Sequence, residues 1–282
     1  MATYTPNYNF TKIALTDAPP DITVLNANWD TIDAKLKNIE TTAANVKNAQ
    51  SNDAYLITTV YVSPSGLDTN DGLSEALPMK TIQAAVAKYA GLPRLWVRCR
   101  AGTYTGTECF NVAGFTSLII SSFSNTETVT IKFPFRFQGG VVQFDGVVID
   151  VSAYEGADHN AAIEFVGSNF YVTNTNIKGT TSINGLFARW GGAGAILAST
   201  ISSCNRAVRG ETGAVISVSG VTSNSNNNIA VSASNSVIAC SSISSITATT
   251  KTERTSSGVI FNAGNLVGTT TNVSALSVTA VS

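Results

Sequence analysis

The segment Asp150–Ala162 holds the residues whose types and spacing could most readily do chemistry. It brings together Tyr154, Glu155, Asp158 and His159, the only histidine of the chain. Two carboxyl groups about 5–9.5 Å apart can hydrolyse a glycosidic bond, and the same polar and aromatic groups can instead bind a glycan without cleaving it. A solvated loop with no ligand is a third interpretation, so we assign no catalytic residue.

A second candidate site combines two arginines with a tryptophan. In the repeat described below, Arg189 and Arg209 fall in one column on neighbouring rungs, with Trp190 and Glu211 nearby in sequence. Two guanidinium groups about 5 Å apart repel each other unless they are paired or exposed. An acidic sugar could bind there, with Trp190 as a stacking platform. We favour instead a strand end that turns outward, with Glu211 as the counter-ion.

Composition argues against several classes of function. The net charge of −1 leaves no basic surface for nucleic acid or an anionic membrane, and no apolar stretch is long enough to insert into a membrane. The chain has one histidine and no closely spaced cysteine pair, so we expect no metal and no cofactor. The four cysteines are interpreted as reduced thiols: Cys99, Cys109, Cys204 and Cys240. Met1–Phe10 lacks a signal-peptide pattern, so we expect synthesis and folding in a cytoplasm.

A repeat dominates the second half of the chain. Five segments align without internal gaps: Phe135–Ile149, Ile163–Ile177, Phe187–Ile201, Ala207–Val221 and Ile229–Ile243. Three apolar columns run through them in that order: Phe135, Ile163, Phe187, Ala207, Ile229; Phe144, Val172, Ile196, Ile216, Ile238; and Ile149, Ile177, Ile201, Val221, Ile243. A turn column lies between the first two, where glycine permits a sharp corner: Gly139, Gly167, Gly191, Glu211 and Ala233.

This alignment predicts two short strands per unit across a turn of constant length. Successive third-column positions are 28, 24, 20 and 22 residues apart, so only the return connection varies. A constant scaffold with variable return loops is typical of a parallel solenoid. We therefore expect an all-β parallel β-helix in which like apolar side chains stack in continuous columns. In this register no two acidic residues stack on adjacent rungs, which argues against a hydrolase with both carboxylates in one chain.

An apolar repeat with alternating steps of four and three residues precedes the solenoid. Its members are Leu25, Trp29, Ile32, Leu36, Ile39, Ala43 and Val46. The spacing is the heptad pattern of a coiled coil, and leucine at position a with isoleucine at position d disfavours two strands. We expect an oligomerising helix that joins three or more chains. An amphipathic helix packed on its own domain is the alternative, which the spacing alone does not exclude.

Two stretches resemble known families. Tyr61–Val86 (YVSPSGLDTNDGLSEALPMKTIQAAV), followed by Ala101–Gly106 (AGTYTG), resembles the helix-capped first rung of pectate-lyase-like right-handed β-helices, a fold common in bacteriophage tail spikes and fibres. The stretch from Tyr8 to Ile32, with LNANWDTI at Leu25–Ile32, resembles N-terminal attachment segments of phage tail or fibre proteins. We expect an attachment segment and coiled-coil helix over 1–53 and a cap with the first rung over 54–106. The parallel β-helix follows over 107–268, with a C-terminal cap or intertwined tail over 269–282.

For function, the resemblance implies a structural fibre or spike component of a virion or phage-tail-like particle. It would be a homotrimer, made in the bacterial host cytoplasm and displayed on the particle surface. Its partners would be its own copies, tail, baseplate or capsid proteins at the N-terminus, and host surface glycans. Because many proteins of this fold cleave polysaccharides, a glycan hydrolase or lyase is the alternative. A purely architectural element without a ligand is a third reading.

Overall fold

The structure is a computed structural model, and it describes residues 3–4, 11–12, 22–51, 57–154, 159–223, 227–241, 245–255, 257–262 and 270–273. It divides into two compact units, Met1–Leu56 and Ile57–Ser282. Within the described ranges, no helix combines the length and apolarity needed to cross a membrane.

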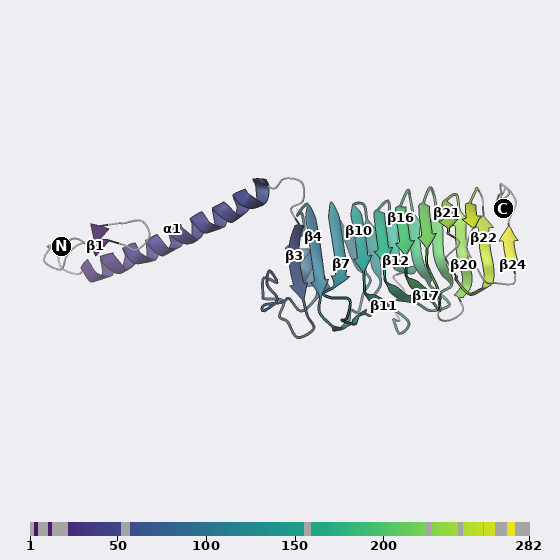
Figure 1. Cartoon of the computed structure of the whole chain (residues 1–282), viewed down its shortest axis with the longest axis horizontal. Helices are drawn as coiled ribbons and strands as arrows, with labels where there is room; N and C mark the ends of the chain where they lie inside the picture. The colour runs from purple at the N-terminus through teal and green to yellow at the C-terminus, as the bar shows by residue number, and fades with distance from the viewer. Residues whose placement is uncertain are drawn as a thin grey trace. The chain divides into compact units, whose positions relative to one another are not determined.

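The first unit contains one long helix, α1 (Ile22–Ser51), and a short antiparallel pair, β1 (Thr3–Tyr4) with β2 (Thr11–Lys12) (Figure 1). Four members of the predicted heptad stripe are exposed on α1: Trp29, Ile32, Leu36 and Ile39. Leu25 and Val46 lie on the same helix, but their side chains fall outside those that the structure describes. An apolar stripe in water is unfavourable, which leaves self-association as a way to cover it.

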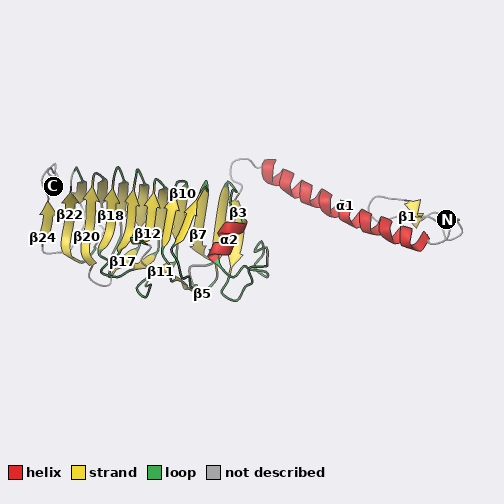
Figure 2. Ribbon diagram, turned by 180° about the vertical axis from the view of Figure 1, so that it is seen from behind, coloured by secondary structure: helices red, strands yellow, loops and turns green. Residues whose placement is uncertain are grey.

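The second unit is a parallel β-solenoid of about six turns, as predicted (Figure 2). Among the described residues its strands form three sheets. The nine-stranded sheet contains β3 (Ile57–Val62), β4 (Arg94–Cys99), β7 (Ser117–Ser122), β10 (Val141–Asp145), β13 (Asn169–Thr173), β16 (Ala193–Leu197), β19 (Val215–Ser219), β21 (Val237–Cys240) and β23 (Val259–Asn262). The five-stranded sheet contains β5 (Gly102–Tyr104), β8 (Val129–Ile131), β11 (Val148–Asp150), β14 (Asn176–Lys178) and β17 (Thr200–Ser202). The eight-stranded sheet contains β6 (Phe110–Ala113), β9 (Phe135–Gln138), β12 (Ala161–Val166), β15 (Asn184–Arg189), β18 (Arg206–Glu211), β20 (Asn227–Ser234), β22 (Ala248–Thr255) and β24 (Thr270–Val273).

The core of the solenoid is built from residues that alternate along each strand, because successive side chains point to opposite faces of a sheet. β13 and β19, for example, bury their second and fourth residues. Aromatic rings fill the middle rungs, where Phe137 stacks on Phe165 with ring centroids 5.7 Å apart. Phe165 in turn stacks on Phe170 at 4.2 Å. Later rungs use Ile, Val, Ala and Cys at inward positions.

A short helix covers the first rungs, in the segment that resembles a helix-capped opening. Helix α2 (Ile82–Lys88) begins after Thr81, whose hydroxyl oxygen accepts a hydrogen bond from the Ala84 amide at 3.1 Å. Such an N-cap satisfies a helix donor that would otherwise lack a partner. The predicted apolar face of this helix is confirmed, since Ile82, Ala85 and Val86 are buried.

The four cysteines form no disulfide and are all buried. Burial raises the pKa of the Cys204 and Cys240 thiols to about 12, and it also raises that of Cys99. Because the thiolate is the reactive form, these side chains act as small core residues.

The register of the later rungs differs from the predicted one. Phe135 pairs with Ile163 as predicted, but Ile163 pairs with Leu186 and not Phe187. The predicted Ala207 and Ile229 are likewise replaced by Val208 and Val231 in this column. The cause is the turn before the nine-stranded sheet, which has two residues at Gly139–Gly140 and Gly167–Ser168 but three at Trp190–Gly192 and Thr212–Ala214.

The second predicted column is in fact two columns. Val172 pairs with Ile196 as predicted, but Ile196 pairs with Val218, which pairs with Cys240. Ile216 and Ile238 instead continue the neighbouring inward column of Val142, Phe170 and Gly194. The third column shifts in the same way, because Thr200 bridges to Thr222, so Val221 does not follow Ile201; Ile243 lies outside the described residues. A shift of two residues keeps each side chain on its own face, so all five predicted members remain buried.

The corner column is also different from the prediction. Gly139 and Gly167 occupy it, with φ of 74° and 62°, but Trp190, Thr212 and Asn235 follow them in place of Gly191, Glu211 and Ala233. Their φ values are 52°, 48° and 47°. Each rung therefore turns through a left-handed residue immediately after its strand in the eight-stranded sheet. Side chains other than glycine adopt this conformation at a cost of about 1–2 kcal/mol, which the stacked rungs must offset.

Gly194→Ala should lower the free energy of unfolding by about 3 kcal/mol, because the inward column has no space there. A Cβ atom at Gly194 would lie 2.0 Å from the backbone oxygen of Phe170 and 2.7 Å from its Cγ. The matched control is Gly191→Ala, where φ is +77° but nothing lies within 4 Å, so only the backbone cost of about 1 kcal/mol applies. Urea denaturation of both variants checks this, and equal shifts would contradict it.

Candidate functional site

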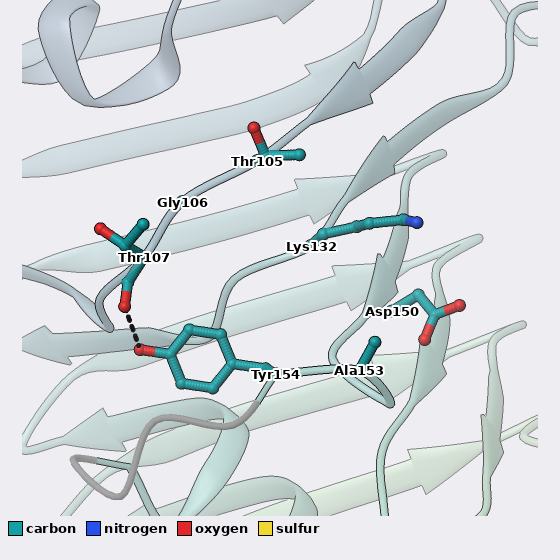
Figure 3. A pocket seen from close by; sticks show the side chains of 7 residues that line it. All are labelled: Thr105, Gly106, Thr107, Lys132, Asp150, Ala153 and Tyr154. Atoms are coloured by element: carbon teal, nitrogen blue, oxygen red, sulfur yellow. Dashed lines mark hydrogen bonds between the residues drawn. The ribbon is translucent and has the colours of Figure 1, made fainter.

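A polar pocket lies at the edge of the five-stranded sheet, where three successive strands end (Figure 3). Its volume is about 320 Å³. β5 leads into Thr105–Thr107, β8 leads into Lys132, and β11 ends at Asp150, while the loop after β11 supplies Ala153 and Tyr154. Because parallel strands in register end at one edge of a sheet, side chains from separate rungs converge there.

Tyr154 forms one wall of the pocket and is held from two directions. Its hydroxyl donates a hydrogen bond to the backbone oxygen of Thr107 at 3.3 Å. Its ring meets the ring of His159 edge-on, with centroids 4.6 Å apart. The structure therefore brings these two predicted site residues together, whereas Glu155 and Asp158 lie outside the described residues.

Asp150 lies on the opposite side of the pocket from Tyr154 (Figure 3). Its Oδ1 accepts hydrogen bonds from the Ser152 amide at 3.0 Å and from the Ser152 hydroxyl at 2.5 Å. Its Oδ2 lies 3.5 Å from the Lys178 ammonium on the next rung. Partial burial by itself would raise the pKa of Asp150, but the Ser152 hydrogen bonds and the Lys178 charge outweigh it and lower the pKa. The group is therefore a fixed carboxylate and not a proton donor at neutral pH.

Asp150→Asn should lower the free energy of unfolding by about 1 kcal/mol at pH 7. The folded pKa lies below the unfolded value of about 3.9, so the stabilisation is present above that value and is lost as pH falls through the folded pKa. Urea denaturation of both proteins between pH 7 and pH 3 should show the difference shrinking at acid pH. Lys178→Gln should remove part of this pH dependence. A difference that stayed constant over the whole range would contradict the assignment.

Lys132 supplies the positive charge of the pocket. Its side chain is exposed and extends over the same side as Asp150 (Figure 3). Within the residues that the structure describes, no carboxylate forms an ion pair with it. An ammonium group in this position can bind an anionic group of a ligand.

The arginines of the second predicted site do not share a column. Arg189 pairs in register with Val166, while Arg209 pairs with Phe187. The predicted repulsion between stacked guanidinium groups therefore does not arise. The error has the same origin as the shifted register, because the three-residue turn after β15 was not foreseen.

Both arginines already have anionic partners. Glu164, only 1% exposed, lies 2.5 Å from Arg136 Nε and 2.7 Å from Arg189 Nη2. Arg209 forms an ion pair with Glu211, the counter-ion expected from the sequence. These contacts make the cluster a structural network on the eight-stranded sheet and leave little charge for a ligand.

Trp190 differs from its arginine neighbours because it is 60% exposed at the corner. The Arg189 guanidinium lies 4.5 Å from its ring centroid. One face of the ring is thus engaged by a cation, and the residue is a weaker candidate for a sugar platform than Tyr154.

The described residues hold no pair of carboxylates placed for glycoside hydrolysis on adjacent strands. Asp145 pairs in register with Thr173, Asp150 with Lys178, and Glu164 with Arg136 and Phe187. Asp150 is the one carboxylate among the residues that line the pocket. The described part of the chain also holds no group of three or more His, Cys, Asp or Glu that could bind a metal. The geometry of these residues supports binding more directly than catalysis.

Three comparisons with known proteins found nothing similar: no protein-family model, no curated protein and no solved structure matches the chain. Function must therefore be argued from the residues of the site and from the fold.

Proposed function

We propose that the chain is a structural fibre or spike component of a bacteriophage or phage-tail-like particle, and that its solenoid binds glycans of the host cell surface. The observation that carries this proposal is the pocket of about 320 Å³ on a rigid stack of rungs, lined by hydroxyl groups, a cation, a carboxylate and a tyrosine ring. Sugars present hydroxyl groups and a hydrophobic ring face, which such a lining complements. The resemblance of Tyr61–Val86 to first rungs of phage spikes supports the virion setting.

The proposal includes a right-handed winding of the solenoid and an attachment role for residues 1–53. Connections between parallel strands of one sheet are right-handed in about 98% of cases, which supports the winding. The N-terminal segment would bind tail, baseplate or capsid proteins. The chain would be made in the bacterial host cytoplasm and then displayed on the particle surface.

A homotrimer is part of the same proposal. The exposed stripe of Trp29, Ile32, Leu36 and Ile39 on α1 has the heptad spacing of a coiled coil of three or more strands. The solenoid also carries a surface suited to contact between copies. From β13 to β23, the strands of the nine-stranded sheet contain no Asp, Glu, Lys or Arg, and three side chains on it are about half exposed: Tyr171, Val215 and Phe261.

Native mass spectrometry of the full chain tests the trimer. We expect three times the chain mass for the wild type and the monomer mass for a double variant, Ile32→Lys with Ile39→Lys, since charges at two d positions oppose the coil. Lys37→Glu, at an exposed position off the stripe, serves as the control. A monomeric wild type would contradict the trimer and, with it, the fibre.

Binding of the fluorescently labelled full chain to a panel of bacterial strains tests the attachment role. We expect saturable binding to some strains that is lost after periodate oxidation of their surface glycans. Binding that survives periodate, or no binding to any strain, would contradict a glycan-binding role.

A polysaccharide depolymerase on the same fold is the second candidate. The specific observation in its favour is that Glu155 and Asp158 follow directly after Tyr154 of the pocket in the sequence. Release of reducing ends, or of unsaturated sugars absorbing in the ultraviolet, from host envelope glycans would reveal it. Turnover that is abolished by Glu155→Gln or Asp158→Asn would replace the binding proposal with this one.

A further inference from the structure

A second, smaller pocket adjoins the first and shares Thr105 with it. Its volume is about 170 Å³, and its lining comes from the cap, α2 and β5: Pro64, Lys80, Thr81, Gln83, Thr103, Tyr104 and Thr105. The two pockets together span the ends of β5, β8 and β11. A ligand that occupied both would therefore be longer than a single sugar.

Each pocket contains one lysine. Lys80 and Lys132 are both exposed, and neither forms an ion pair with a carboxylate within the described ranges. The backbone at Lys80 is fixed, because the amides of Lys80 and Thr81 donate hydrogen bonds to Asp68 Oδ1 at 2.9 Å and 2.8 Å. Lys132 is fixed through its amide, which donates to the backbone oxygen of Tyr104 at 2.8 Å. The two ammonium groups thus extend from rigid backbone positions.

The charge balance of the paired pockets is positive. Asp150 is the one carboxylate among the lining residues, and its oxygens already accept two hydrogen bonds from Ser152 and face the Lys178 ammonium. Lys80 and Lys132 therefore remain as cations without a described counter-charge. The rest of the lining is neutral and polar, with four threonines and Gln83.

We propose that the two adjoining pockets bind an acidic oligosaccharide, with a carboxylate of one sugar on Lys132 beside Tyr154 and a second anionic group on Lys80. Threonine hydroxyls and the Gln83 amide pair with the sugar hydroxyl groups between these two charges. This inference rests on the proposed glycan-binding function, which it narrows to a polyanionic glycan.

The test uses the full chain and three acidic hexasaccharide probes: a hyaluronan, an α2,8-linked oligosialate and an oligogalacturonate. Each is compared with its carboxyl-reduced form by isothermal titration calorimetry. We expect at least one acidic probe to bind, its carboxyl-reduced form to bind at least tenfold more weakly, and Lys132→Gln and Lys80→Gln each to weaken binding by about tenfold or more. Lys88→Gln is the matched control, since this lysine bonds the backbone oxygen of Asn70 and lines neither pocket.

The outcomes separate this inference from the function on which it rests. Binding of neutral and acidic forms with equal affinity, or no loss on substituting either lysine, overturns the acidic ligand while leaving glycan attachment intact. No binding of any probe together with periodate-sensitive binding to cells also overturns the acidic ligand alone. No binding of any probe together with no binding to cells overturns both. Thermal unfolding of Lys132→Gln and Lys80→Gln at the wild-type temperature shows that any loss of binding is not a loss of fold.

Discussion

Phe137→Ala is expected to lower the free energy of unfolding by about 4 kcal/mol, the largest effect of any single substitution considered for this chain. The side chain is fully buried. Its ring contacts four others, with centroid distances of 5.6–6.0 Å: Phe115, Phe135, Phe144 and Phe165. Truncation would leave a cavity between rungs that the neighbouring backbone is too rigid to fill, because each rung is fixed by hydrogen bonds to both neighbours.

The substitution should also divide the unfolding of the solenoid into two steps. Each rung contacts only its neighbours, so stability is close to a sum of rung and interface contributions. A weak interface in the middle therefore separates two cooperative blocks. Urea denaturation followed by tryptophan fluorescence and circular dichroism measures both effects. Phe261→Ala, which removes a half-exposed ring, should cost less than about 1 kcal/mol; a similar cost for both variants would contradict the assigned core.

Glu164→Gln is expected to lower the free energy of unfolding by about 3 kcal/mol, although the two side chains have nearly the same shape. Glu164 is the shared partner of Arg136 and Arg189 and is itself almost fully buried. A neutral amide would leave two partly buried guanidinium groups close together without a counter-charge. The cost arises from the unpaired cations more than from the lost attraction.

Two further variants establish the origin of this effect. Glu40→Gln disrupts an exposed pair with Lys37 at 3.7 Å on α1 and should change stability by less than about 0.5 kcal/mol. Replacing all three members of the buried group, as Arg136→Met, Glu164→Leu and Arg189→Met, should restore most of the loss, because well-packed apolar groups often replace a buried ion network without cost. A Glu164→Gln protein as stable as the wild type would show that the carboxylate is not needed.

The architecture could be predicted because each inward position repeats an aliphatic or aromatic residue. Phe144, Val172 and Ile196 stack as the alignment predicted. The register of Ile216 could not be predicted in the same way, since a slip of two residues leaves the pattern of buried and exposed positions unchanged. Only the length of the turn at Trp190–Gly192 decides it, and non-glycine residues at the left-handed corners concealed that length.

The candidate site was predicted in part. Tyr154 and His159 stood out because they lie in the longest return loop of the aligned core, where function is commonly found. Lys132 was missed because it is a single ordinary lysine one rung before the aligned segments. The signal that would have found it is positional: Thr105, Lys132 and Asp150 each follow an inward residue at the end of a strand of the five-stranded sheet.

The charge-free outer face of the nine-stranded sheet has a consequence for how the particle would respond to ionic strength. Mobile ions screen attraction between opposite charges, with a Debye length of about 8 Å at 0.15 M, so a glycan held by Lys80 and Lys132 would be released as sodium chloride is added. Contacts between copies through Tyr171, Val215 and Phe261 involve no charge to screen, and sulfate would strengthen them. A fibre built this way stays assembled in brine while it lets go of its host.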